Sequence, residues 1–386
     1  MGRNRPLQFD ANATMGVQDD LWLKVSVLCE GALNPSSIHS GGQRARALIE
    51  EARQQVRLLV SAPAKAKVIF TSGATEANLL ALSQAKQFLN WQIISSAIEH
   101  PSILGTLSSP EFEKRHQLVF PNRAGIVSVE SVLEKITPNT RLVSIMYANN
   151  ETGVIQPIAK IAALLKKAHP QILIHTDAVQ AAGKLGFSWN ELGVDMLTLS
   201  GHKLGSFPGV GALICRPDLI VEPFLLGGPQ ESRLRAGTEN LPGIVSMGLC
   251  AERARLELTE RTATWVLQKQ TILETVQNLV PEIRLTTDAA CIPNTLHLFI
   301  PGIRGDDLVV ALDLLGIATS TGAACASGKI EPSHVLLAMG LNEETARSSL
   351  RISLGLKLRD EDIAQFSSSL ADCIRRLQKR TSHAHL

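Results

Sequence analysis

The sequence predicts an α/β fold with a mostly parallel sheet flanked by helices and a smaller α+β domain attached. Short apolar runs typical of buried strands alternate with segments whose apolar residues recur at helical spacing. Polar residues gather directly after several of these strands. The length of 386 residues also suits more than one domain. We place the large domain at 17–260 and the small domain at 1–16 and 261–386.

The first half of the chain supplies the strands of the parallel sheet. Apolar runs that end in polar or small residues predict these strands, and 3.6-residue periodicity predicts the helices between them. The predicted strands are Val68–Thr71, Ile93–Ser95, Leu142–Ala148, Ile172–Asp177, Val194–Leu199 and Gly211–Cys215. The predicted helices are Gly42–Val60, a helix opening at Thr75, and Ile158–Ala168.

The second half predicts shorter-range α+β structure after one long helix, and we place the domain boundary within that helix. The segment Thr321–Gly328 is a loop of small residues around one cysteine, Cys325, which leaves the thiol accessible. The predicted helices are 244–279, Asp306–Leu315 and Glu361–Leu377; the predicted strands are Asn294–Ile300, Gly316–Ser320 and Leu350–Leu354; and Arg380–Leu386 is predicted to be a frayed tail.

Composition excludes several classes of function. Hydrophobic residues make up 45% of the chain and charged residues 19%, and the net charge of +2 favours neither a nucleic acid nor an anionic membrane as partner. No apolar run is long enough for a transmembrane helix, and the first residues lack the apolar core of a signal peptide. Six scattered cysteines show no metal-binding spacing, so we expect no metal and free thiols in the cytoplasm.

A lysine at the end of a buried strand is the residue around which the site is predicted. Lys203 follows Val194–Leu199, and a surface lysine at a turn is the simpler interpretation if it is taken alone. A lysine partly withdrawn from water could instead form a Schiff base. Asp177 ends another strand, and Thr71–Glu76 joins a strand to a helix with free amides. A carboxylate, an anion-binding turn and a reactive lysine together suit pyridoxal phosphate.

Four polar residues collect where strands of the predicted sheet end: His100, Asn150, Asp177 and Lys203. Ligands of parallel sheets bind at the carboxyl ends of the strands. Each residue alone is more simply a hydrated loop residue. The four together favour a functional site.

With these residues assembled, the chain resembles the cysteine desulfurases of the NifS/IscS type, which are pyridoxal-phosphate enzymes of the class V aminotransferase fold. The resemblance extends from Phe9-Asp-Ala-Asn-Ala-Thr14 to Leu350-Arg-Ile-Ser-Leu-Gly355. The motifs that carry it are Thr71-Ser-Gly-Ala-Thr-Glu76, Ala148-Asn-Asn-Glu-Thr-Gly153, His175-Thr-Asp-Ala-Val-Gln180, Ser200-Gly-His-Lys203, Arg235-Ala-Gly-Thr-Glu-Asn240 and Ser320-Thr-Gly-Ala-Ala-Cys325.

The resemblance implies a role for each matching residue. Lys203 would bind the cofactor aldehyde and move the substrate α-proton, and Cys325 would take the sulfur as a persulfide. The remaining implied roles are ring contacts for His100, Asp177 and Gln180, phosphate contacts for Ala74, Thr75, Ser200 and His202, a phosphate contact from the partner subunit for Thr238, and substrate-carboxylate binding for Asn150 and Arg351.

One departure from the family concerns the turn after the lysine. The family usually has Gly-Pro-Lys-Gly there, whereas this chain has Ser206-Phe-Pro-Gly209. The change alters a loop charge and the shape of the turn, and it leaves the lysine in place.

The expected function is therefore removal of sulfur from L-cysteine to give L-alanine and a persulfide on Cys325. A homodimer is expected, with a sulfur-acceptor protein as partner. The acceptor would be an iron-sulfur cluster scaffold or a tRNA-thiolation carrier, and Cys325 could also ligate a cluster. A selenocysteine lyase or another class V enzyme is the nearest alternative. A catalytically silent scaffold is a third interpretation, and it predicts loss of the lysine or the loop cysteine, yet both are present.

Overall fold

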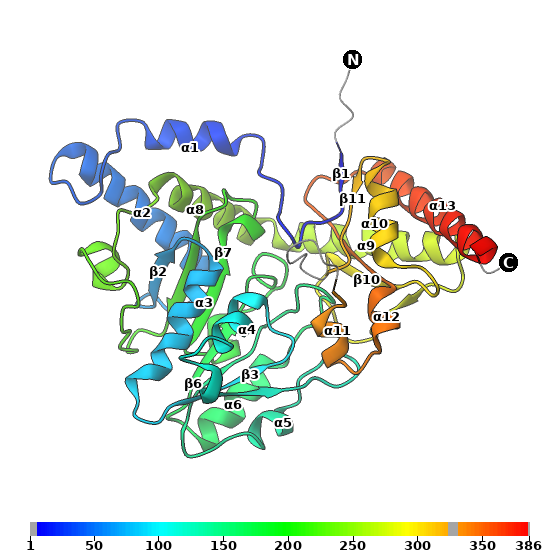
Figure 1. Cartoon of the computed structure of the whole chain (residues 1–386). Helices are drawn as coiled ribbons and strands as arrows, with labels where there is room; N and C mark the ends of the chain where they lie inside the picture. The colour runs from blue at the N-terminus through cyan, green and yellow to red at the C-terminus, as the bar shows by residue number, and fades with distance from the viewer. Residues whose placement is uncertain (1–5, 323–330, 385–386) are drawn as a thin grey trace.

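The computed structural model describes residues 6–322 and 331–384, and for 380–384 it describes only the backbone. Figure 1 shows a larger lobe built on a central sheet and a smaller lobe beside it. The sheet has seven strands in the order β2-β8-β7-β6-β5-β3-β4, and only β8 runs against its neighbours. Its strands are β2 Lys67–Thr71, β3 Gln92–Ser96, β4 His116–Val119, β5 Thr140–Ser144, β6 Leu173–Asp177, β7 Met196–Ser200 and β8 Gly211–Cys215. This confirms the predicted α/β class with a mostly parallel sheet.

Helices cover both faces of this sheet because successive residues of each strand enter different apolar cores. On β7, Leu197 and Leu199 belong to one core, whereas Met196 belongs to the core on the opposite face. The strands are therefore buried on both sides, which explains their nearly continuous apolar sequence. The helices of this lobe are α1 Leu21–Cys29, α2 Ser40–Leu59, α3 Ala74–Ser83, α4 Pro101–Leu107, α5 Val129–Leu133, α6 Ile158–Ala168, α7 Trp189–Leu192 and α8 Leu241–Leu256.

The smaller lobe has a separate apolar core. A three-stranded antiparallel sheet in the order β12-β10-β9 packs with helices that include α9, α10 and α13. Its elements are β9 Arg284–Leu285, β10 Thr295–Phe299, β11 Ile317–Ala318, β12 Ser349–Ser353, α9 Leu258–Leu279, α10 Gly305–Asp313 and α13 Asp360–Ala384. Two short helices, α11 His334–Ala338 and α12 Glu343–Arg347, precede β12, and their buried residues Val335, Leu336 and Ala346 pack in the core of the larger lobe. The division at 16/17 and 260/261 stays a prediction.

The N-terminal segment joins the two lobes. Strand β1 (Leu7–Gln8) pairs in parallel with β11, and Phe9 stacks on Phe366 in the smaller core. The chain then crosses to α1 in the larger lobe (Figure 1). Residues 9–15 therefore lie between the two cores, and several of their polar groups contact the site described below.

Several predicted elements have different bounds in the structure. The long helix predicted over 244–279 is two helices, because Glu257 leaves helical geometry between α8 and α9. The last helix continues to Ala384, beyond the predicted end at Leu377 and into the predicted tail. Strand β4 was not predicted, since its sequence His116-Gln-Leu-Val119 has only two apolar residues at an edge of the sheet. Among the described residues, no helix is both long and apolar enough to cross a bilayer.

Candidate active site

The carboxyl edge of the central sheet carries the predicted site residues. Strand β6 ends at Asp177, and β7 ends at Ser200 and continues into a 3-10 turn at Gly201–Lys203. His100 is the N-cap of α4, which follows β3. Since β3, β6 and β7 run in the same direction, their ends meet at one edge.

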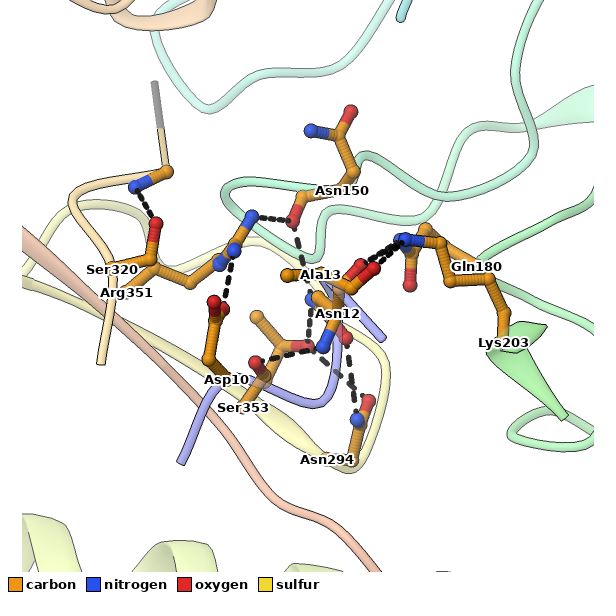
Figure 2. A network of polar contacts seen from close by, with 12 residues as sticks. Asp10, Asn12, Ala13, Asn150, Gln180, Lys203, Asn294, Ser320, Arg351 and Ser353 are labelled. Carbon is orange, nitrogen blue, oxygen red and sulfur yellow. Dashed lines mark hydrogen bonds and ion pairs between the residues drawn. The ribbon is translucent and has the colours of Figure 1, made fainter. Parts of the chain in front are cut away.

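Lys203 is held by the N-terminal segment. Its Nζ donates to the backbone oxygens of Asn12 at 2.5 Å and Ala13 at 2.6 Å (Figure 2). Burial, followed by the positive charge of Arg351, lowers the pKa of this amine to about 8, and Asp10 and Asp177 act in the opposite direction. The lowered pKa gives this amine a larger neutral fraction near pH 7 than an ordinary lysine has, and the neutral form is the nucleophile.

Asp177 is buried and hydrogen-bonded through both carboxylate oxygens. Asn78 Nδ2 donates to Oδ2 at 2.8 Å, and the backbone N–H of Val179 donates to Oδ1 at 2.9 Å. A fixed negative charge at this position suits a partner that carries a protonated nitrogen.

Two histidines flank the lysine, and both have pKa values below the ordinary range. Burial is the largest cause for each; Lys203 adds to the effect on both, while Asp177 opposes it at His100. The pKa of His202 falls to about 4. The Nδ1 of His100 accepts from the backbone N–H of Ser102 at 3.1 Å. Both rings are therefore neutral near pH 7 and can stack on, or donate to, a ligand.

The start of α3 forms the predicted anion site. No side chain caps the helix at Gly73, so the amides that begin at Ala74 and Thr75 are not bonded by a capping group. Gly211 of β8 lies directly beneath this turn, and a Cβ there would come within 2.5 Å of the Gly73 backbone. The absence of a side chain at 211 thus permits the close packing of strand and turn.

Arg351 brings the smaller lobe into the same site. It lies on β12, and its guanidinium donates to Asp10 Oδ1 at 2.5 Å and to the Asn150 carbonyl at 3.0 Å (Figure 2). Only 4% of the residue is exposed, and its Nε has no partner among the described residues. A buried guanidinium with a free N–H is suited to bind a substrate carboxylate.

The structure leaves the predicted roles of two site residues untested. Thr238 is exposed, and the structure describes a single chain, so its predicted contact across a dimer interface stays a prediction. Within this chain, Arg235 of the same loop pairs with Glu76 of α3 at 2.8 Å. Cys325 lies outside the described residues.

Sequence reasoning missed several residues that complete the site. Asp10 and Asn12 belong to a segment that the sequence alone predicts only as a turn, although it opens the family resemblance. Lys184, a lysine only 1% exposed, contacts both Asn12 and Gln180. Its position four residues after Gln180 was the available signal. Asn78 lies one turn into α3, directly after the predicted anion motif.

The turn that departs from the family pattern packs into the larger lobe. The Phe207 ring stacks on Trp22 of α1 with centroids 4.0 Å apart, and Ser206 Oγ lies 2.8 Å from Ser246 Oγ on α8. These contacts replace a charged turn with one held by α1 and α8. Lys203 keeps its place beside Asn12.

Comparison with known proteins decides the family. The model of the family described as aminotransferase class V matches residues 10–366. The chain belongs to the class V aminotransferases. The described part of this class V chain contains no group of three or more His, Cys, Asp or Glu side chains arranged to hold a metal.

Relatives of this class V chain include the cysteine desulfurase IscS of Clostridium botulinum, which is 36% identical over 368 residues, covering 93% of this chain and 92% of the relative. The X-ray structure of a NifS-like protein from Rickettsia africae superposes with a TM-score of 0.86 at 31% identity, over 96% of this chain and 99% of that one. SspA in complex with cysteine superposes with a TM-score of 0.77 at 31% identity, over 90% and 98% of the two chains. These likenesses confirm the NifS/IscS resemblance and its fold.

The class V family implies pyridoxal phosphate, and the chemistry of the residues present fits that group. The uncapped amides of α3 suit a phosphate, the buried and hydrogen-bonded Asp177 suits a protonated ring nitrogen, and the Lys203 amine suits an aldehyde. The three features come from different elements and meet at one edge of the sheet.

Proposed function

We propose that this chain is a pyridoxal-phosphate-dependent cysteine desulfurase that converts L-cysteine to L-alanine and leaves the sulfur as a persulfide on Cys325. The observation that carries the proposal is the arrangement around Lys203. Its amine has a pKa lowered to about 8, and it lies in the electrostatic field of Asp177 and of Arg351. Relatives named cysteine desulfurase cover more than nine-tenths of this chain.

Different residues of the site would bind different parts of the cofactor. The amides at Ala74 and Thr75, with Ser200 and His202, would hold the cofactor phosphate. Asp177 would pair with the ring nitrogen, His100 would stack on the ring, and Gln180 would donate to the ring oxygen. When bound, pyridoxal phosphate supplies an electron sink for negative charge at the substrate Cα.

Substrate orientation and proton transfer come from the chain itself. Arg351, together with Asn150, binds the substrate carboxylate and thereby fixes the Cα near Lys203. The Lys203 amine, neutral in part near pH 7, takes the α-proton and returns protons to the product carbons.

Sulfur transfer requires a second nucleophile. The thiolate of Cys325 attacks the substrate sulfur, so that an S–S bond forms while the substrate C–S bond breaks. The electron pair of that bond stays with the carbon fragment, which takes up a proton and leaves as alanine. The persulfide then passes to an acceptor protein, which we propose is a cluster scaffold or a thiolation carrier. A homodimer with Thr238 at the partner's site, and a cytoplasmic location, belong to the same proposal.

The test measures alanine and protein-bound persulfide after L-cysteine is added to the cofactor-loaded protein. Cys325→Ala should keep the spectral change on adding cysteine and lose nearly all alanine and persulfide. Cys29→Ala, which removes a half-buried thiol on α1, is the matched control and should behave as wild type.

Two outcomes would contradict the proposal. Wild-type alanine formation by Cys325→Ala would remove the acceptor role of this cysteine. Rapid turnover of selenocysteine without any protein persulfide would favour a selenocysteine lyase instead.

A further inference from the structure

A second lysine lies within hydrogen-bond distance of the site network, and it has no part in the chemistry proposed above. Lys184 is 1% exposed, whereas lysine is among the residues least often found fully buried. Burial is the largest cause that lowers its pKa well below the ordinary value, and Lys203 and Arg351 add to the effect. The amine of Lys184 donates hydrogen bonds to neighbouring side chains.

Lys184 donates to two side-chain oxygens. Its Nζ lies 2.6 Å from Gln180 Oε1 and 3.0 Å from Asn12 Oδ1. An amide side chain has an acceptor at one end and donors at the other. A donor at the oxygen end therefore favours one orientation of each amide, and at Asn12 the Nδ2 of Asn294 adds a second donor to Oδ1 at 3.3 Å.

The nitrogen ends of both amides then face hydrogen-bond acceptors. Gln180 Nε2 donates to the Asn12 backbone oxygen at 3.0 Å (Figure 2). Asn12 Nδ2 donates to Thr295 Oγ1 at 2.8 Å. The same Asn12 oxygen accepts from Lys203. Lys184 thus bonds the side chains of Gln180 and Asn12, and both residues lie next to the Asn12 backbone oxygen that accepts from Lys203.

One N–H of Gln180 has no acceptor among the residues that the structure describes. The amide nitrogen has two hydrogens, and the Asn12 oxygen takes one of them. The second is available to an acceptor at the site. If Gln180 were turned over, an oxygen would face that acceptor and repel it.

We propose that Lys184 is a positioning residue that fixes the Gln180 amide and the Asn12 segment so that an N–H of Gln180 faces the ring oxygen of pyridoxal phosphate. The ring-oxygen contact rests on the proposed function. Lys184 does not touch the cofactor itself, because its amine is bonded to Asn12 and Gln180.

The principal test is cofactor affinity, measured by titrating apoprotein with pyridoxal phosphate and following absorbance. Lys184→Met keeps the length of the side chain and removes the donor to Gln180 Oε1, whereas Asn12 Oδ1 still accepts from Asn294 Nδ2 at 3.3 Å. We expect the Kd to rise about tenfold, and the visible absorption maximum of the bound cofactor to shift. Lys160→Met, at an exposed position of α6, is the control and should leave both unchanged.

A second variant keeps Lys184 and tests the orientation directly. Gln180→Glu retains an oxygen for Lys184 and replaces the outward nitrogen with oxygen. The account predicts a Kd at least about tenfold higher for this variant. This measurement decides the question even if Lys184→Met does not fold.

A double-mutant cycle separates positioning from bulk packing. If Lys184 acts through Gln180, the double variant Lys184→Met/Gln180→Leu should have a Kd less than about twofold above that of Gln180→Leu alone. The contact between the two residues is already lost in Gln180→Leu, so the two effects should not add. Full additivity, or wild-type Kd and absorption maximum in Lys184→Met, would overturn the proposal. A wild-type protein that binds the cofactor yet forms no alanine would overturn the proposed function and leave the Lys184 result standing.

Discussion

The sheet edge and the N-terminal segment both contribute residues to the site, but different kinds of contact place these residues. Asp177 and Lys203 are placed by parallel strands that end together, so their positions follow from the topology of the larger lobe. Asp10 and Asn12 are placed by contacts with residues more than 130 positions away in the sequence, including Arg351, Lys203 and Asn150. The first region supplies the reacting groups, and the second fixes them and brings in the substrate-binding arginine.

This difference teaches that the site depends on both apolar cores. Phe9 packs in the smaller core, and the polar residues that follow it bond to the ends of strands from the larger lobe. Loss of a sheet-edge residue should therefore impair chemistry. Loss of an N-terminal residue should impair stability and chemistry together.

The largest effect should come from a sheet-edge carboxylate. Asp177→Asn removes the negative charge proposed to face the cofactor ring, and we expect kcat to fall about 100-fold to 1,000-fold with little change in Tm. Asp195→Asn is the matched control, since Asp195 is equally buried but precedes β7 at the opposite edge and bonds the Ile174 amide. It should lower Tm and leave kcat unchanged. A large loss of kcat in Asp195→Asn with wild-type kcat in Asp177→Asn would contradict the assignment of the site to the edge that carries Asp177.

The next effect should come from the arginine of the smaller lobe. Arg351→Gln removes a buried charge that we assign to the substrate carboxylate, so KM for cysteine should rise about 30-fold or more, with cofactor affinity nearly unchanged. Arg359→Gln, at a highly exposed guanidinium, serves as the control. Steady-state kinetics over a wide cysteine range measures the effect. An unchanged KM would remove Arg351 from substrate binding.

The sequence predicted the sheet edge far better than it predicted the N-terminal segment. Strand ends are local features, so Asp177, Lys203 and the anion-binding turn could be found from apolar runs followed by polar residues. Asn12 forms hydrogen bonds with residues far away in the sequence, such as Thr295 and Ser353, and no local sequence pattern predicts those contacts. The break at Glu257 was missed for a similar reason, because the sequence on both sides of it is compatible with a helix.

A smaller effect, on both activity and stability, should follow from changing the segment that joins the lobes. Asn12→Ala removes hydrogen bonds to Thr295, Asn150 and Lys184. We expect Tm to fall by about 4 °C and kcat by about tenfold. Asn139→Ala, at an exposed turn, is the control and should change neither. A variant with reduced kcat and wild-type Tm would show that the segment does not join the two cores energetically.

The smallest effect concerns pH. Capture of pyridoxal phosphate by the apoprotein should accelerate as pH rises through about 8, because the neutral form of the Lys203 amine is the nucleophile. The charge of Arg351 lowers the pKa of Lys203, so Arg351→Gln should move the midpoint of this profile upward. Stopped-flow absorbance measures the rates. A midpoint that moves downward in the variant would have the wrong sign for this coupling.

The most direct measurement of the central claim distinguishes the two lysines of the site. Borohydride reduction of the cofactor-loaded protein, followed by peptide mapping, should place the pyridoxyl group on Lys203, whose amine contacts the Asn12 and Ala13 carbonyls at the sheet edge. Lys184 also has a lowered pKa, but its amine is enclosed by Asn12 and Gln180. Labelling of Lys203 alone, lost in Lys203→Ala, is the result we predict. Labelling of Lys184, or of any other lysine, in the wild-type protein would contradict the account.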